Sequence, residues 1–169
     1  MIVKSPFVDD EVHVSLNRNV GKFELATEVE LPAPLEEVFA FFSDAKNLAA
    51  ITPGWLNFKI LSDLPIEMKK GATIDYQLNW HGLPMKWRSE VAEWRLNDRF
   101  VDRQLKGPYR SWWHEHMFFD LAGEATLMRD RVLYSVPGGR MIHKLIVKKD
   151  VKKIFEFRRK MIVDLFNQQ

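Results

Sequence analysis

The chain has 169 residues, of which 46% are hydrophobic, 28% charged and 12% aromatic, a balance typical of one globular domain and not of a disordered chain. It contains no cysteine, which excludes disulfides, cysteine-ligated zinc and thiol catalysis. The net charge of +2 is too small to predict a nucleic-acid partner, and no run of about 18 apolar residues predicts stable membrane insertion. The first ten residues do not resemble a secretory signal, so we expect a cytoplasmic protein.

The first third of the chain predicts a strand followed by two short helices. Residues 1–21 are weakly patterned and are expected to form an N-terminal arm, in which residues 12–16 alternate enough for a short strand. Residues 23–31 alternate strictly between apolar and polar side chains, which predicts a strand with an acidic outer face. Pro34 suits the first turn of a helix, and a second short helix is expected over residues 44–51.

Residues 55–136 have the pattern of strands and turns throughout. The clearest strand covers residues 73–80, where apolar and polar side chains alternate. A shorter run is expected at residues 56–61. Four more strands are expected at residues 85–94, 99–105, 112–121 and 126–136. The short links between them favour antiparallel neighbours. Residues 140–166 then predict one long amphipathic helix.

This order of elements predicts an α+β domain over residues 22–169. Six to seven antiparallel strands should form a curved sheet wrapped around the long C-terminal helix, because a sheet of that length twists and only this helix can cover its apolar face. A straight helix does not fill a curved trough. We therefore expect a cavity between the two, partly plugged by the two short helices.

Several short motifs carry a resemblance to a known group of proteins. They are Pro32-Ala33-Pro34-Leu35-Glu36-Glu37-Val38-Phe39, Ile51-Thr52-Pro53, Gly107-Pro108-Tyr109, Trp112-x-His114-x-His116-x-Phe118, and Met128-x-Asp130 with Tyr134 and Pro137. From Phe23 to the C-terminus the chain resembles the START-like, or SRPBCC, helix-grip superfamily that includes Bet v 1-like proteins. Within it, the chain is most similar to bacterial polyketide cyclase/dehydrase-like ligand-binding proteins. The resemblance implies the helix-grip fold and a site for a small hydrophobic ligand, without a cofactor.

The most specific local feature is the pair His114 and His116. Two residues apart on a strand, they point to the same face, and buried imidazoles require hydrogen-bond partners. Asp130 on the next strand, and Asp102 and Gln104 on the previous one, are the candidates. Three interpretations stay open: a polar network that orients a ligand, a purely structural network, and a site for acid–base or metal chemistry. The catalytic candidates are His114, His116 and Asp130, and the prediction includes no metal.

The inward faces of the strands and the C-terminal helix supply the remaining candidates for the cavity. The predicted ligand-binding residues are Tyr76, Leu78, Trp80, Trp87, Phe100, Asp102, Gln104, Trp112, His114, His116, Phe118, Met128, Asp130, Tyr134, Ile154 and Phe155. The aromatic members of this set fit an ordinary core equally well. Trp113 falls on the opposite face from the histidine pair, so it is expected to be partly exposed and to suit a homodimer contact.

Three functions follow from these patterns. The first is the binding of a small hydrophobic metabolite, such as a polyketide, isoprenoid or lipid, in the cavity. The second is a cyclase or dehydratase that uses the histidine and aspartate groups in the same cavity. The third is a membrane- or partner-docking module that uses the basic residues between Lys148 and Lys160, although such a run is more often a solvated helix face.

Overall fold

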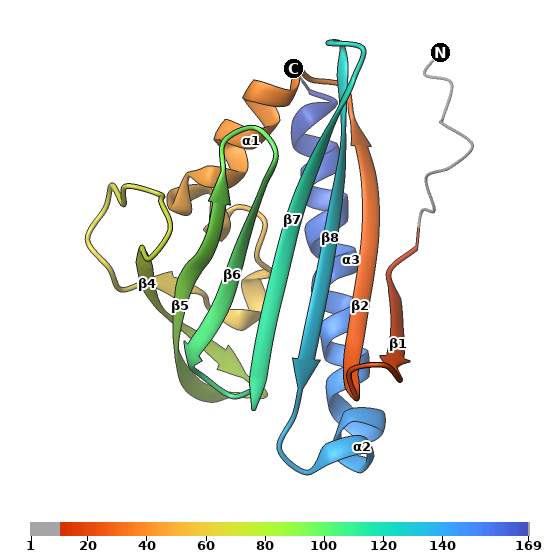
Figure 1. Ribbon diagram of the computed structural model, residues 1–169. Helices are drawn as coiled ribbons and strands as arrows, with labels where there is room; N and C mark the ends of the chain where they lie inside the picture. The colour runs from red at the N-terminus through yellow and green to blue at the C-terminus, as the bar shows by residue number, and fades with distance from the viewer. Residues whose placement is uncertain (1–10, 169) are drawn as a thin grey trace.

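The computed structural model describes residues 11–168, and it contains an eight-stranded antiparallel sheet and a long C-terminal helix (Figure 1). The strands are β1 (His13–Asn17), β2 (Lys22–Leu31), β3 (Lys59–Ile60), β4 (Thr73–Trp80), β5 (Leu83–Arg95), β6 (Arg99–Lys106), β7 (Ser111–Leu121) and β8 (Ala125–Ser135). Their order across the sheet is β1-β2-β8-β7-β6-β5-β4-β3. The helix-grip fold predicted from the sequence is therefore confirmed.

The strand count differs from the predicted six to seven because both edges of the sheet carry a short strand. β1 pairs with β2 at one edge and β3 pairs with β4 at the other. β1 lies inside the segment that we expected to be an N-terminal arm, and residues 1–10 of that arm lie outside the described residues. Neither edge strand has a fully buried side chain, so its sequence pattern is weak.

Three short helical segments lie between β2 and β3: two that the sequence predicts, and a 3₁₀ turn at Gly54–Leu56. α1 (Leu35–Ser43) begins directly after Pro34, and its side chains Val38 and Phe39 are buried. The second segment, expected at residues 44–51, is a 3₁₀ helix at Ala45–Ala49 and not an α-helix. The side chain of Asp44 caps this 3₁₀ helix by accepting a hydrogen bond from the backbone N–H of Lys46 at 3.1 Å.

The C-terminal helix spans the length expected, but its first part is not regular. It consists of α2 (Gly139–Ile142), a π-helical segment (His143–Val147) and α3 (Lys148–Phe166). The buried side chains His143, Val147, Val151 and Phe155 recur every four residues. In an ideal α-helix of 3.6 residues per turn that spacing drifts around the helix, and the wider π turn compensates part of the drift. None of the helices in residues 11–168 is long and apolar enough to cross a membrane.

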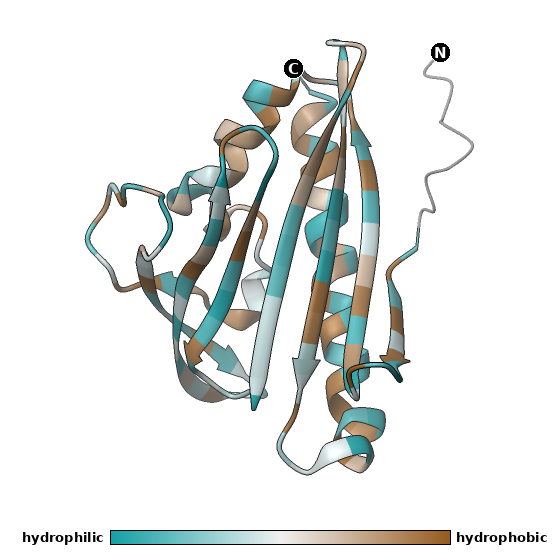
Figure 2. Cartoon of the chain, viewed as in Figure 1, coloured by the Kyte–Doolittle hydropathy of each residue, from teal (hydrophilic) through white to brown (hydrophobic). Residues whose placement is uncertain are grey.

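The sheet and α3 form two layers, with α3 running along one face of the sheet beside β8 and β2 (Figure 1). Figure 2 shows the alternation of hydrophobic and hydrophilic residues along the long strands. This alternation makes one face of the sheet apolar, and the helix covers that face. β5 carries two register shifts against β6, near Arg88/Ser89 and Val91/Glu93. Such bulges bend and twist a strand, so they contribute to the curvature that separates this end of the sheet from α3.

The buried side chains between the sheet and the helices form two hydrophobic clusters, one near each end of the long strands. The first packs under α1 and includes Phe39, Phe118 and Met128. The second packs under the start of α3 and includes Val132 and Tyr134. The two histidines and the aspartates lie between these clusters.

Candidate functional site

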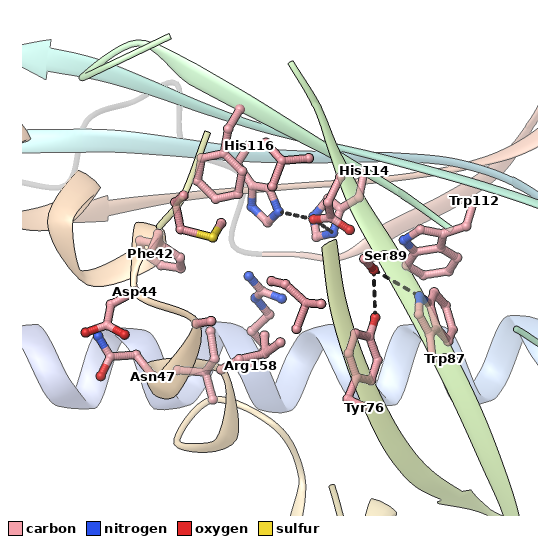
Figure 3. A pocket seen from close by; sticks show the side chains of 18 of the residues that line it. Phe42, Asp44, Asn47, Tyr76, Trp87, Ser89, Trp112, His114, His116 and Arg158 are labelled. Atoms are coloured by element: carbon pink, nitrogen blue, oxygen red, sulfur yellow. Dashed lines mark hydrogen bonds and ion pairs between the residues drawn. The ribbon is translucent and has the colours of Figure 1, made fainter. Parts of the chain in front are cut away.

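A cavity of about 190 Å³ lies between α3, the concave face of the sheet and the segment around α1. Aromatic rings from the strands and α3 form much of its wall, including Trp87, Trp112 and Phe155. The Trp87 ring meets the Trp112 ring edge-on, with centroids 5.4 Å apart. The expected hollow between sheet and helix is therefore present, and Figure 3 shows the side chains that surround it.

The polar end of the cavity is built on the three central strands. His114 on β7 lies opposite Asp102 on β6, and His116 on β7 lies opposite Asp130 on β8. Because side chains alternate along a strand, the register brings all four groups to the inner face. The exposed fraction of each imidazole is 5% or less.

Two carboxylates hold the two imidazoles from opposite sides. His114 Nε2 is 3.0 Å from Asp130 Oδ1, and His116 Nε2 is 3.0 Å from Asp102 Oδ2. The second nitrogen of each ring faces the other carboxylate: His116 Nδ1 is 2.8 Å from Asp130 Oδ1, and His114 Nδ1 is 3.9 Å from Asp102 Oδ2. The two rings lie against each other with centroids 3.8 Å apart. We call Asp102, His114, His116 and Asp130 the histidine–aspartate cluster.

The surroundings give the two histidines different pKa values. Burial lowers the pKa of His114, and the neighbouring His116 lowers it further. Burial opposes a charge on His116 as well, but Asp130 and Asp102 outweigh it and raise the pKa of His116. Burial also disfavours charge on Asp130, yet His116, His114 and Arg158 hold its pKa well below the usual range. These directions favour an imidazolium at His116 between two carboxylates, beside a neutral His114.

Arg158 completes the site, and our sequence interpretation placed it wrongly within a solvated basic face. Its side chain rises from α3 toward the histidine pair (Figure 3) and is only 13% exposed. Its Nε is buried without an acceptor, and within residues 11–168 its nearest carboxylate oxygen is Asp130 Oδ2 at 3.9 Å. The signal was present in the sequence, because residues 151, 155, 158 and 162 follow helical spacing on one face.

A second polar group lies in the cavity wall, and the sequence predicted only part of it. The hydroxyl of Ser89 on β5 lies 3.1 Å from the Tyr76 hydroxyl and accepts a hydrogen bond from Trp87 Nε1 at 3.1 Å. Tyr76 and Trp87 were predicted for the cavity, and Ser89 was not. Burial raises the pKa of the Tyr76 phenol well above its usual value, so this hydroxyl stays protonated and can donate.

The structure brings many of the predicted side chains together around the cavity. Those that line it are Tyr76, Trp87, Phe100, Asp102, Trp112, His114, His116, Ile154 and Phe155. Asp130 lies one layer behind, in contact with both histidines.

Other predicted side chains point inward but meet something else. Phe118 and Met128 belong to the hydrophobic cluster under α1. Tyr134 is buried in the second cluster, where its hydroxyl lies 2.9 Å from His143 Nε2. Gln104 hydrogen-bonds the backbone of Tyr109 through both ends of its amide, at 2.7 and 3.2 Å, and so fixes the β6–β7 turn.

Leu78 and Trp80 line a second, mostly apolar cavity of about 250 Å³. Trp87, Tyr109 and Ile154 border both cavities, so the two spaces share one wall of side chains. Trp80 additionally donates a hydrogen bond from Nε1 to Asp150 at 2.7 Å, which ties the end of β4 to α3.

Trp113 points away from the cavity, as its position on β7 predicts. Its indole Nε1 donates to Glu115 Oε1 at 3.1 Å, and the side chain is half-buried on the outer face of the sheet. The homodimer contact suggested by this tryptophan stays a prediction.

Comparisons with known proteins fit this geometry. Residues 31–160 match the family model described as polyketide cyclase / dehydrase and lipid transport. No curated protein matches the sequence.

Solved structures share the fold at low sequence identity. An aromatase/cyclase, Zhui, from Streptomyces sp. R1128 is 16% identical with a TM-score of 0.60, over 82% of this chain and 92% of that one. A START superfamily protein from Mycobacterium smegmatis is 18% identical with a TM-score of 0.63, over 88% and 99%. A point mutant of norcoclaurine synthase from Thalictrum flavum is 12% identical with a TM-score of 0.63, over 94% and 97%. The family model covers well over half of the chain, so this protein belongs to the polyketide cyclase/dehydrase and lipid transport family, with the START-like helix-grip fold.

Proposed function

We propose that this protein binds a small, mostly apolar molecule that carries one hydrogen-bond-accepting group, in the cavity between α3 and the sheet. The single observation that carries the proposal is Arg158. A buried guanidinium whose Nε–H has no acceptor is costly to keep unless a partner arrives, and this one faces a cavity with aromatic walls. Ligand pockets commonly combine an apolar lining with a few placed polar groups.

The lining suits a flat or hydrocarbon-rich body. The rings of Trp87, Trp112 and Phe155 supply apolar contact area, and the Tyr76 hydroxyl adds a second polar point in the wall. The first cavity by itself is small for a ligand pocket. The first cavity and the second cavity, which lies on the other side of Ile154, together reach the volume range usual for ligand pockets. A larger ligand would therefore fit once the shared side chains move.

A cyclase or dehydratase is the second candidate function, favoured by the histidine–aspartate cluster. Adjacent titratable groups whose pKa values are pushed apart are a common basis for an acid and a base at one site. In this role His116 would donate a proton and His114 would accept one from a substrate held in the cavity.

The docking function has less support than either. Arg158, one of the basic residues assigned to a docking face, is turned into the cavity. Lys152 lies 3.7 Å from Glu156, and Lys153 lies over the Trp55 ring. These neighbours leave a weaker basic surface on α3 than the sequence pattern suggested.

The binding proposal is tested with a matched pair of small probes, 1-naphthoate and 1-methylnaphthalene, titrated against intrinsic tryptophan fluorescence. We expect the wild type to bind the anion more tightly, because Arg158 offers it charged donors. Arg158→Met should lower the affinity for 1-naphthoate by about tenfold or more and leave the affinity for 1-methylnaphthalene nearly unchanged. Lys160→Met, on the same helix but exposed, is the control and should bind both probes as the wild type does.

The outcome against the proposal is equal binding of both probes by wild type and Arg158→Met, or no binding of either probe. His114→Gln and His116→Gln then separate the two candidate functions. A binding protein should lose only part of its affinity in these variants. An enzyme should keep its affinity for a polyketide-like substrate and lose turnover. Turnover is measured as the rate of product formation, by mass spectrometry.

A further inference from the structure

We propose that Asp102, His114 and His116 form a binding site for a divalent transition-metal ion, of which zinc is the type. The site lies in the wall of the cavity and does not depend on which organic molecule, if any, the cavity holds. The three side chains can each offer a donor atom, and these atoms lie within 4.8 Å of one another.

The first support is convergence on one oxygen. His116 Nε2 and His114 Nδ1 are 3.0 and 3.9 Å from the same atom, Asp102 Oδ2. Nitrogen and oxygen ligands of tetrahedral zinc lie about 2.1 Å from the metal, so the ligand atoms are about 3.4 Å from each other. The two observed distances bracket that value, and small side-chain rotations would complete the geometry.

The second support is the position of Asp130 behind the two rings. Its Oδ1 is 3.0 Å from His114 Nε2 and 2.8 Å from His116 Nδ1, which are the nitrogens that face away from Asp102. Metal-ligating histidines commonly hold a carboxylate with the nitrogen that does not bind the metal, and this contact fixes the tautomer. The N–H of His114 Nε2 is directed at Asp130, which leaves the Nδ1 lone pair of this ring on the side of Asp102. His116 Nδ1 lies close to Asp130 but makes no hydrogen bond with it, while His116 Nε2 points at Asp102.

The third support is the balance of charge. A metal ion that binds His116 displaces its proton, and the two neutral imidazoles with Asp102 and Asp130 then carry two negative charges, which a divalent cation neutralises. Arg158 leaves one further positive charge beside the site, 3.9 Å from Asp130, and this charge suits an anionic ligand on the metal. Two imidazoles with one carboxylate favour zinc and its neighbours in the first transition series over magnesium or calcium.

The fourth coordination position would face the cavity. Both histidines are almost fully buried, whereas the Asp102 side chain is 25% exposed and all three residues line the hollow. Three protein ligands with one open position are typical of zinc sites that bind water or a substrate oxygen.

The test uses the full-length protein without a tag, freed of metal by a chelator and dialysis. Zinc is titrated by calorimetry, and Co²⁺ is followed by its visible absorption. We expect one ion per chain, d–d bands of a low-coordinate cobalt site, and no measurable binding of Mg²⁺. His114→Ala and Asp102→Asn should abolish the cobalt bands, and Asp130→Asn should weaken binding about 10- to 100-fold without removing the bands.

His143→Gln and His81→Gln are matched controls, because each changes a histidine outside the cluster, and both should bind like the wild type. Circular dichroism shows whether each variant is folded. The proposal is overturned if the folded wild type binds neither ion. It is also overturned if binding survives in His114→Ala or disappears in His81→Gln.

Discussion

At the scale of single residues, burial decides the chemistry of each polar group. His143 illustrates this outside the cavity. Its ring stacks on Phe23 with centroids 3.4 Å apart, and its Nε2 lies 2.9 Å from the Tyr134 hydroxyl. When the phenol donates to this nitrogen the imidazole is neutral, because a protonated Nε2 can only donate. Burial, and then the charge of Lys148, lower the pKa of His143 below 6.5.

This depressed pKa predicts a pH-dependent contribution to stability. The neutral form is favoured in the folded state, so the contribution is complete above pH 6.5 and is lost as the pH falls from 6.5 toward the lower folded-state pKa. We expect His143→Gln, which keeps an acceptor for Tyr134, to lack this loss. Urea unfolding of both proteins between about pH 5 and 8 measures this contribution. The free energy of unfolding of the wild type minus that of His143→Gln should shrink as the pH falls. A difference that is constant with pH would contradict the assignment.

At the scale of elements, α1 closes one end of the trough, and Phe39 is its most deeply buried aromatic side chain. Phe39 is 1% exposed and meets the rings of Trp94, Phe100 and Phe118 edge-on, with centroids 5.2 to 6.0 Å apart. Such edge-on pairs add to the area that the ring buries.

Phe39→Ala is expected to lower the free energy of unfolding by about 3–5 kcal/mol, because it removes a fully buried ring and leaves a void. Phe119→Ala is the comparison. This ring is 41% exposed on the outer face of β7, so its loss should cost far less. Urea denaturation of the two variants gives both values, and similar costs would show that α1 does not anchor the fold.

At the scale of the whole molecule, the hollow results from a straight helix crossing a bent sheet. β5 bends at its bulges, and the space that opens toward α3 is lined by Val91 from β5 and Ile154 from α3. A true hollow and a solid core respond differently when a side chain on its wall is enlarged.

Val91→Phe is expected to leave the free energy of unfolding unchanged or to raise it by about 1 kcal/mol, because the added ring enters empty space. The same variant should bind 1-naphthoate much more weakly, because the new ring fills the space that the probe would occupy. In a solid core the larger ring would instead cost about 1–3 kcal/mol. Denaturation and probe titration on one sample distinguish these cases, and strong destabilisation would show that the space does not admit a guest.

Much of the fold could be predicted from local patterns. Alternation along residues 73–80 and helical spacing along residues 140–166 report which face of an element is apolar, and each face had to be buried against another layer. The partnership of His114 and His116 with Asp130 and Asp102 followed from the same alternation on neighbouring strands. These features depend on residues within one element or on adjacent antiparallel strands, so the sequence by itself determined them.

Only the tertiary structure decided what each inward side chain meets. A period of two identifies the inner face but not the depth along the trough, so Trp112 lines the cavity while Phe118 on the same face packs under α1. Arg158 was missed because a charged residue in a basic run is usually solvated. Its burial depends on how α3 packs against the sheet, and that packing arises from contacts between elements far apart in the sequence.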